Sequence, residues 1–301
     1  MKIKFSPAIK AALKKGNPVV ALESTIIAHG MPFPQNLEMA SKVESIIVEE
    51  GAIPATIAII NGELRAGLSA DELEQFAQHG SSIMKVSTRD IPFAVAKKIS
   101  GATTVASTMR LAAMAGISVF ATGGIGGVHR GAEKTFDVSA DLGEFAQSNV
   151  AVITAGAKSI LDLALTLEVL ETYGVPVIGF GTDEFPAFYS RSSGLRLAMR
   201  LDTAKEIAAV MKAKWKLNLN GGIVIANPIP TNAEIPAHEI EPIIQQALED
   251  SKRLKISGKE TTPFLLKAIT AATQGRSLKA NIALVENNAR LAAQIATAYS
   301  Q

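Results

Sequence analysis

Two side chains able to do chemistry follow runs of apolar residues that predict buried strands. Glu23 stands directly after the run 19–22, and Lys158 stands four residues after the run 150–154. Open α/β sheets bind their ligands at the carboxyl ends of their strands, so both positions favour a site. An uncharged lysine amine is a nucleophile toward carbon, and a carboxylate at a strand end is placed for ligand chemistry. Alternatively, Glu23 is a solvent-exposed residue at the end of a strand and has no role in a site.

The residues after Lys158 predict how its amine is activated. Residues 159–171 carry apolar side chains at helical spacing, which predicts a helix with Lys158 at or just before its N-terminus. The positive end of the helix dipole, together with burial, disfavours the ammonium form of a lysine. Lysines are mostly solvent-exposed, so the alternative is a solvated residue of the first turn. The spacing leaves both interpretations open.

A glycine-rich loop lies between these two predicted strands. Five glycines between residues 123 and 131 follow the apolar run 117–122. Glycines let backbone amides approach a ligand closely, and amides clustered after a strand commonly hold phosphate. His129 and Arg130 add charge to the same loop. The loop lacks the third glycine of a dinucleotide-binding fingerprint and does not occupy the first βα turn, so a dinucleotide site is not expected.

Polar residues continue beyond this loop. Asp137 is followed closely by Ser139 and Asp141, and the latter two can also cap a helix that begins near residue 142. Capping and ligand contact are compatible. A second acidic pair, Asp183 and Glu184, is interpreted as part of a loop or a subunit contact.

Lys85 lies inside another short apolar run, residues 83–88, which predicts a strand. An unpaired ammonium group costs several kcal/mol or more when it is buried, so we expect Lys85 to have a partner or a ligand.

Strand and helix patterns alternate over most of the chain. Continuous apolar runs predict buried strands at residues 17–24, 54–60, 83–88, 103–106, 117–122, 150–154, 175–180 and 221–226. Beyond residue 236 only helices are predicted, at residues 238–251, 263–274 and 278–299. We therefore expect one domain over residues 1–301 with a three-layer α/β/α fold. Its mostly parallel, mixed central sheet spans about residues 17–226, and a helical C-terminal part spans about 236–301.

Composition excludes several classes of protein. The 301 residues are 48% hydrophobic, which is enough for a substantial core. Thirty basic and 28 acidic residues leave a net charge of +2, with no basic stretch that would indicate binding to nucleic acid or to a membrane. The absence of cysteine excludes disulfides and thiolate chemistry. No signal peptide or spanning helix is predicted, so we expect a cytoplasmic protein.

The chain resembles the pseudouridine-5′-phosphate glycosidases, a family also called indigoidine synthase A-like. Eleven ordered blocks carry the resemblance over essentially the whole sequence, which makes it far more specific than one glycine motif. The blocks that matter for a site are ALESTIIAHGMPFPQNLEMA (21–40), KVSTRD (85–90), TTVASTM (103–109), ATGGIGGVHRGAE (121–133), DVSADL (137–142), AGAKSILD (155–162) and SLKANIALVENNARLAAQIA (277–296).

The resemblance implies an activity and a set of site residues. Enzymes of this family interconvert pseudouridine 5′-phosphate with uracil and D-ribose 5-phosphate, need a divalent metal, usually Mn²⁺, and are typically homotrimers. The family's covalent nucleophile falls on Lys158, its proton donor on Glu23 and its metal ligand on Asp137. Substrate contacts fall on Lys85, Val105, Ser139, Ala140, Asp141, Thr122, His129 and Asn281.

This chemistry accounts for the pairing of an amine with an acid. Pseudouridine joins ribose to uracil through carbon, so the two-carboxylate mechanism of ordinary glycosidases is inadequate. An amine that adds at the anomeric carbon and opens the ribose ring leads to an iminium, which serves as an electron sink. Glu23 then protonates uracil as the bond breaks. The two groups must not form a direct ion pair, and we expect ligand or solvent between them.

Two other functions fit some of the same residues. A Schiff-base lyase or aldolase for another phosphosugar would also use a lysine, an acid and a phosphate loop. A sugar-phosphate sensor without catalytic activity would use the loop alone, and the combination of Lys158, Glu23 and Asp137 argues against it.

Overall fold

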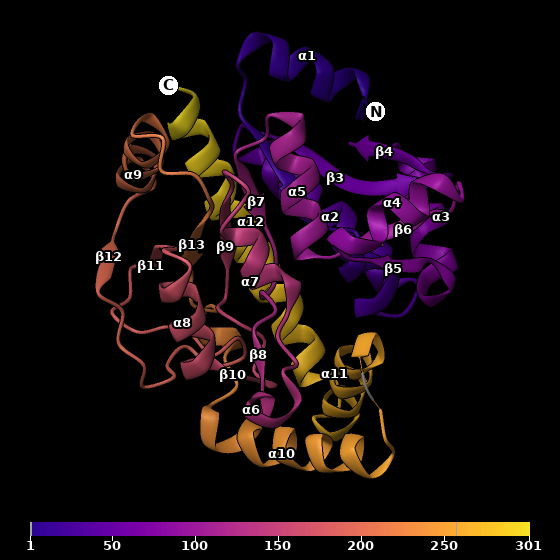
Figure 1. Cartoon of the computed structure of the whole chain (residues 1–301), viewed down its shortest axis with the longest axis vertical. Coiled ribbons are helices and arrows are strands. Elements are labelled where there is room, and N and C mark those ends of the chain that lie inside the picture. Colours follow the sequence, from indigo (N-terminus) through magenta and orange to yellow (C-terminus); the bar gives the residue numbers. More distant parts are fainter. Residues whose placement is uncertain (1, 257) are drawn as a thin grey trace.

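The computed structural model describes residues 2–256 and 258–301. Its strands are β1 (Lys4–Phe5), β2 (Val19–Leu22), β3 (Ile53–Ile60), β4 (Glu63–Ala66), β5 (Met84–Val86), β6 (Gly101–Thr103), β7 (Val119–Ala121), β8 (Val128–His129), β9 (Ala151–Thr154), β10 (Leu161–Asp162), β11 (Val177–Phe180), β12 (Met199–Leu201) and β13 (Ile223–Ala226). Eleven of these described strands form one sheet, and β8 and β10 form a small antiparallel pair (Figure 1).

The helices come between and after the strands. They are α1 (Pro7–Lys15), α2 (Gln35–Glu49), α3 (Ala70–His79), α4 (Ile91–Ala96), α5 (Val105–Ala115), α6 (Ala132–Thr135), α7 (Ala140–Phe145), α8 (Leu163–Thr172), α9 (Ala204–Lys216), α10 (Ala237–Arg253), α11 (Thr261–Ala272) and α12 (Arg276–Ser300). Short helical turns are η1 (Ile26–Gly30), η2 (Gly80–Ser82), η3 (Thr88–Asp90), η4 (Thr231–Ala233) and η5 (Gly258–Glu260), of which η1 is a π-helix.

The central sheet is mixed and mostly parallel, which confirms the predicted fold class. Its strands run in the order β1-β4-β3-β2-β7-β9-β13-β11-β12, with β6 and β5 continuing from β3. Every pair from β3 across to β12 is parallel, whereas β4 and β6 pair with β3 in the antiparallel sense. The parallel strands end together, so the residues that follow β2, β7 and β9 meet at one edge.

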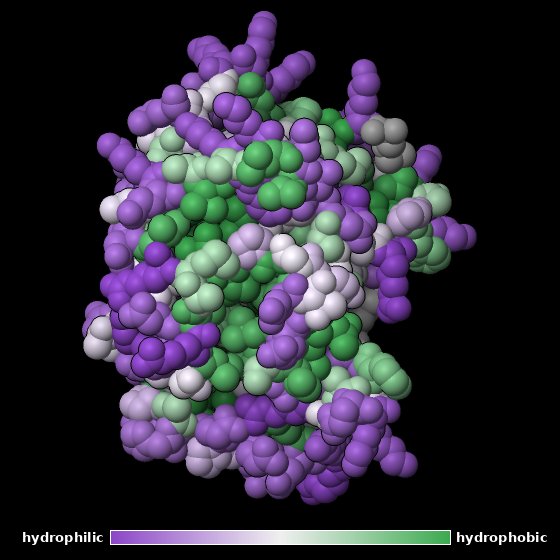
Figure 2. All heavy atoms as spheres, turned by 60° about the vertical axis from the view of Figure 1, so that its left-hand side comes forward, coloured by the Kyte–Doolittle hydropathy of each residue, from purple (hydrophilic) through white to green (hydrophobic). Residues whose placement is uncertain are grey.

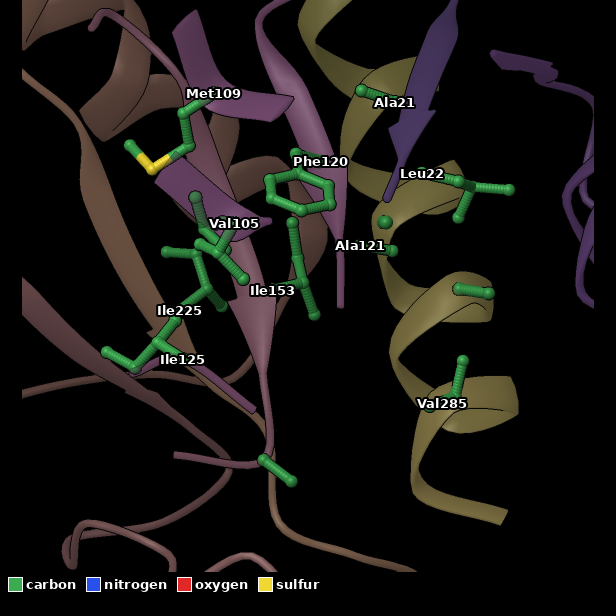
Figure 3. Close-up of a cluster of buried hydrophobic side chains, with 14 of the residues drawn as sticks. Ala21, Leu22, Val105, Met109, Phe120, Ala121, Ile125, Ile153, Ile225 and Val285 are labelled. Atoms are coloured by element: carbon green, nitrogen blue, oxygen red, sulfur yellow. The ribbon is translucent and has the colours of Figure 1, made fainter. Parts of the chain in front are cut away.

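Helices cover both faces of this sheet, because its central strands are apolar on both sides. All four residues of β2, β9 and β13 are buried. Figure 3 shows Met109 of α5 on one side of Phe120 and Ile153, and Val285 of α12 near Ala121 and Leu22 on the other. The long helix α12 packs along α2 and α9 and against β7. The last helix of the C-terminal part, α12, therefore lies in one layer of the fold.

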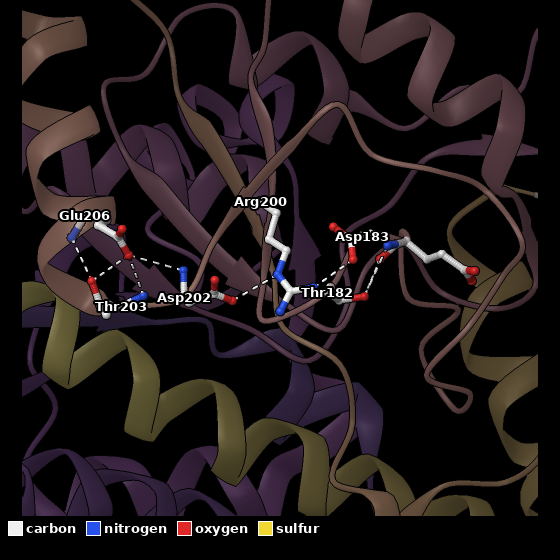
Figure 4. A network of polar contacts seen from close by, with 7 residues as sticks. Thr182, Asp183, Arg200, Asp202, Thr203 and Glu206 are labelled. Carbon is white, nitrogen blue, oxygen red and sulfur yellow. Dashed lines mark hydrogen bonds and ion pairs between the residues drawn. The ribbon is translucent and has the colours of Figure 1, made fainter.

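The sheet edge at β12 is held by polar contacts (Figure 4). The Arg200 guanidinium lies 2.7 Å from the carboxylate of Asp183 and 2.9 Å from that of Asp202. Thr203 and Glu206 form a capping box at the start of α9. Asp183, which we interpreted as a loop or subunit-contact residue, thus pairs with the edge strand of its own sheet.

The face that carries α8 and β12 has apolar side chains across its middle and polar ones above and below (Figure 2). Leu165 of α8 and Met199 of β12 are 40% and 44% exposed. In the described part of the chain, no helix combines the length and the apolar character that crossing a membrane requires.

Candidate active site

A cavity of about 380 Å³ opens where the parallel strands end. This volume suits a small polar ligand such as a nucleotide. Ten of the eleven predicted site residues line the cavity, and only Thr122 does not: the ten are Glu23, Lys85, Val105, His129, Asp137, Ser139, Ala140, Asp141, Lys158 and Asn281. The sequence blocks that contain these residues lie far apart in the chain, and the sheet brings them together.

Glu23 follows β2 directly and is 9% exposed. Burial raises the pKa of its carboxyl group, and this effect prevails over the opposing influence of Lys158 and of a hydrogen bond from the Thr122 hydroxyl. Lys158 lies close enough to influence the pKa of Glu23, and within residues 2–256 and 258–301 the two side chains form no ion pair. A carboxyl group in these surroundings is suited to donate a proton.

Lys158 is not at a helix N-terminus, so that prediction is wrong. The helix α8 begins at Leu163 with Asp162 as its cap, and the apolar residues before it belong to the loop and to β10. The backbone amide of Lys158 donates to the carbonyl of Ile125 over 3.0 Å. Its Nζ donates to the carbonyl of Gly124 over 2.5 Å. The glycine loop therefore holds the lysine in place of a helix.

The loop that carries Lys158 depends on a glycine. Gly156 has φ +91°, a backbone conformation that residues with a side chain rarely adopt. A Cβ at this position would lie 2.0 Å from the carbonyl oxygen of Pro186. The tight turn after β9 therefore requires glycine and directs Lys158 toward the cavity.

Asp141 braces the glycine loop. Its Oδ2 accepts a hydrogen bond from the Gly126 amide over 2.7 Å, and its Oδ1 accepts one from the Ala106 amide over 2.8 Å. A Cβ on Gly126 would lie 2.7 Å from both Asp141 Oδ2 and Ser139 Cβ, which explains the glycine. The Gly126 amide is thus used within the protein, and this part of the predicted phosphate cradle is wrong.

The start of α7 confirms the capping interpretation for Ser139 but not for Asp141, which lies in the first turn. Ser139 is the N-cap of a helix that begins at Ala140, and its Oγ accepts from the Asp141 amide over 3.2 Å. Ser139, Ala140 and Asp141 also line the cavity, so the cap and the cavity wall coincide. Val105 was predicted within a strand, but it begins α5, where Thr104 is the cap. The N-terminus of α5 therefore faces the cavity, and such an end attracts anions.

Two basic side chains share this cavity with Lys158. Burial lowers the pKa of Lys85, and the nearby Lys158 lowers it further. Burial also lowers the pKa of His129, against the opposing influence of Asp137. His129 Nδ1 lies 3.9 Å from Asp137 Oδ2. Arg130, in contrast, does not line the cavity and pairs with Glu241 of α10. Its charge was predicted to add to that of the loop, but it is neutralised in this ion pair.

Asp137 is the only predicted metal ligand, and its side chain is 48% exposed at the cavity wall. Within residues 2–256 and 258–301, no three histidine or acidic side chains converge in a way that would hold a metal ion. The residues present fit a hard cation that keeps mostly water and substrate oxygens, and they do not fit a closed structural site.

Asn281 of α12 brings an unpaired polar atom to the cavity. The residue is 6% exposed, and its Oδ1 is buried without a hydrogen-bond partner in the protein. Buried polar atoms are nearly always paired, so this oxygen is suited to accept from a ligand.

Thr122 is the one predicted site residue that does not line the cavity. It is 2% exposed, and its hydroxyl donates a hydrogen bond to the carboxylate of Glu23. Thr122 therefore supports the acid, and its contact with a ligand stays a prediction.

Several wall residues were not predicted as site residues. They are His29 of η1, Ser87, Thr88 and Arg89 around η3, Phe188, and Thr262 of α11. The run Ser87 to Arg89 begins two residues after Lys85 and lies within the block KVSTRD (85–90), which was the sequence signal for it. The ring of Phe188 contacts Gly124, because a Cβ there would lie 2.6 Å from ring carbons. Such long-range packing has no signature in the local sequence.

The fold and the cavity together are those of an enzyme of the α/β class, in which a lysine and a buried carboxylic acid line one cavity. The sequence model described as "Indigoidine synthase A like protein" matches residues 8–298. The chain belongs to this family.

Curated relatives extend over nearly the whole chain. A protein of Deinococcus radiodurans is 59% identical over 297 residues, 99% of this chain and 95% of its own length. A protein of Escherichia coli is 57% identical over 299 residues, 99% of this chain and 96% of its own length. Both are named pseudouridine-5′-phosphate glycosidase.

A solved structure shares the fold closely. The prealnumycin C-glycosynthase, in complex with ribulose 5-phosphate, is 40% identical with a TM-score of 0.92. The alignment covers 100% of this chain and 97% of that protein.

Proposed function

We infer that this protein is a pseudouridine-5′-phosphate glycosidase. It cleaves the carbon–carbon bond between uracil and the ribose of pseudouridine 5′-phosphate, and it gives uracil and D-ribose 5-phosphate. The observation that carries this function is the placement of Glu23 and Lys158 on one cavity without an ion pair between them. Relatives at 57% and 59% identity that bear this name support the substrate.

Lys158 begins the reaction. Its amine, in the uncharged form, forms a bond to the anomeric carbon, and the bond from that carbon to the ring oxygen breaks. The ring oxygen takes the proton that the nitrogen loses on forming this bond, and it becomes a hydroxyl group. The open-chain sugar is then attached to Lys158 through nitrogen. The hydrogen bond from Nζ to the Gly124 carbonyl supports this role, because it holds the amine at the cavity wall before the substrate arrives.

Glu23 completes the cleavage. Its proton passes to carbon 5 of uracil as the carbon–carbon bond breaks, and the nitrogen lone pair forms the iminium. Water then adds to the iminium, which releases ribose 5-phosphate and the free amine of Lys158. This step needs a protonated carboxyl group, which the raised pKa of buried Glu23 favours.

Positive charge and helix geometry support a place for the phosphate. Lys85 and Arg89 belong to neighbouring segments of the cavity wall, and the N-terminus of α5 faces the same cavity. An ammonium group and a helix N-terminus both stabilise phosphate. The unpaired Oδ1 of Asn281 is suited to accept an N–H of uracil.

Manganese, the oligomeric state and the location are the parts of the proposal that depend most on the family resemblance. Asp137 would hold Mn²⁺, which would supply positive charge for ordering substrate oxygens. Leu165 of α8, which is 40% exposed, is compatible with a homotrimer, since an apolar side chain on a surface helix can be covered by another subunit. A cytoplasmic location completes the proposal.

The direct test is release of uracil from pseudouridine 5′-phosphate by the purified protein with Mn²⁺. We expect turnover, and we expect ribose 5-phosphate to be consumed only when uracil is present. Consumption of ribose 5-phosphate without uracil would indicate a lyase or aldolase for another phosphosugar. Binding without any turnover would indicate a sensor.

A further inference from the structure

A buried asparagine connects α12 to the ends of the central strands. Asn288 is fully buried, although most of its neighbours on the inner face of α12 are apolar. Its Nδ2 donates to the carbonyl of Thr122 over 2.8 Å and to that of Gly123 over 3.4 Å. Carbonyl oxygens only accept, so the orientation of this amide group is fixed by its partners.

A second asparagine completes the contact. Asn227 directly follows β13, and its Nδ2 donates to Asn288 Oδ1 over 2.9 Å. The backbone amide of Asn227 donates to the carbonyl of Thr154 at the end of β9. Asn288 therefore ties together the residues that follow β7, β9 and β13, which is the strand edge that forms the cavity.

The contact leads directly to the acid. Thr122, whose carbonyl Asn288 holds, donates its hydroxyl hydrogen to Glu23. The next residue but one, Gly124, accepts from Lys158 Nζ. A buried polar group in a helix is costly unless it is hydrogen-bonded, and an apolar residue would pack in its place. The side chain of Asn288 therefore stabilises the position of the segment 122–124, and its polar group is not needed to fill the core.

We propose that Asn288 is a positioning residue for the reaction, which holds the segment 122–124 so that the Thr122 hydroxyl orients Glu23 toward the substrate. This inference rests on the proposed function for its catalytic consequence. The hydrogen bond from Thr122 stabilises the ionised carboxylate, so its loss moves the titration of Glu23 to higher pH. The other charged groups that act on Glu23 are Lys158, Asp141 and Lys85.

The test compares Asn288→Leu with Asn287→Leu. Asn287 is the adjacent residue of α12, and its Nδ2 donates to the carbonyl of Pro228 over 3.2 Å, away from Thr122. We expect Asn288→Leu to lower kcat between about 10-fold and 100-fold through misplacement of the acid. We expect the alkaline limb of the pH–rate profile to move to higher pH. Asn287→Leu leaves kcat and the position of this limb unchanged. If Asn288→Leu prevents folding, Asn288→Ala replaces it, because it leaves room for water.

A double-mutant cycle separates positioning from packing. Thr122→Val removes the hydroxyl that Asn288 is proposed to place, so adding Asn288→Leu to Thr122→Val leaves the Glu23 titration where the single Thr122 variant has it. Independent, additive shifts would overturn the proposal. It would also be overturned if Asn288→Leu lowered only the melting temperature and left kcat and the titration equal to those of Asn287→Leu.

The titration itself is followed by infrared difference spectra of the carboxyl group, with Glu23→Gln as the blank. This measurement needs no substrate, so it tests the role of Asn288 even if the wild-type protein releases no uracil. Failure of the proposed function and failure of the positioning role are thus seen in different experiments.

Discussion

Glu23 carries opposing demands at the scale of a single residue. Burial favours its neutral form, whereas Lys158, the Thr122 hydroxyl and Lys85 favour the ionised form. Burial prevails, so the acid keeps its proton at a pH where an exposed glutamate would lose it. The raised pKa therefore suits proton donation. It also means that ionisation of Glu23 destabilises the folded state.

The first prediction concerns Glu23→Gln. The folded-state pKa of Glu23 lies above its unfolded value of about 4.5, so the unfolded chain ionises first as the pH rises. The wild type then loses stability between that value and the raised pKa, and the glutamine variant does not. We expect Glu23→Gln to melt higher than the wild type at pH 8 and nearly equally at pH 4, while kcat falls about 10²-fold to 10⁴-fold.

Thermal melts at the two pH values check the stability part. Equal melting differences at pH 4 and pH 8 would mean that the carboxyl group is not strained by burial. Glu74→Gln is the control, because Glu74 makes only a surface contact within α3.

At the scale of elements, the glycine loop packs closely against the start of α7, where Gly126 contacts Ser139 and Asp141. The second prediction is that Gly126→Ala destabilises the fold and removes activity, because its Cβ would lie 2.7 Å from Ser139 Cβ. Gly143→Ala is the matched control within α7, where a Cβ meets nothing within 4 Å. Alanine there should stabilise the helix by about 0.5–1 kcal/mol. Denaturant titrations of both variants measure the change in the free energy of unfolding. Equal changes in the two variants would contradict the prediction.

The third prediction concerns Asp141→Asn. The aspartate accepts one backbone amide on each oxygen, and asparagine turns an N–H₂ group toward one of these amides. We expect a loss of about 1–3 kcal/mol of stability. Asp137→Asn, on the half-exposed neighbour, should change stability little. A stable Asp141→Asn variant would argue that Asp141 serves the ligand more than the loop.

Much of the fold follows from local patterns. The strands β2, β9 and β13 lie within continuous apolar runs, and such runs are expected where both sheet faces are covered. The alternation of these runs with helical patterns predicted the three-layer α/β/α arrangement. The positions of Glu23 and Lys85 also followed, since each is fixed by a strand of its own.

The surroundings of Lys158 could not be predicted in this way. Its apolar neighbours Ile160, Leu161 and Leu163 fit a helix, but residues 161 and 162 pair with β8, which lies about 30 residues earlier in the sequence. The hydrogen bond from the Thr122 hydroxyl to Glu23 was missed for a related reason. It depends on a contact between residues that follow two different strands, and the sequence near either residue does not indicate it.

At the scale of the whole molecule, α8 carries one apolar side chain that its own chain leaves partly uncovered. Leu165 is 40% exposed, whereas Leu163 and Leu167 pack against the core. The fourth prediction is that the wild type has three times the mass of one chain in light scattering, and that Leu165→Glu lowers this mass. Leu217→Glu, at a residue that is 69% exposed after α9, should leave it unchanged. An unchanged mass in Leu165→Glu would place the subunit contact elsewhere.

The account as a whole depends on which amine captures the sugar. The most direct measurement is mass mapping of the protein after reduction with borohydride in the presence of ribose 5-phosphate. The account predicts one reduced adduct, on the peptide that contains Lys158, which persists in Lys85→Ala and disappears in Lys158→Ala. An adduct on Lys85, or none in a protein that releases uracil, would contradict it.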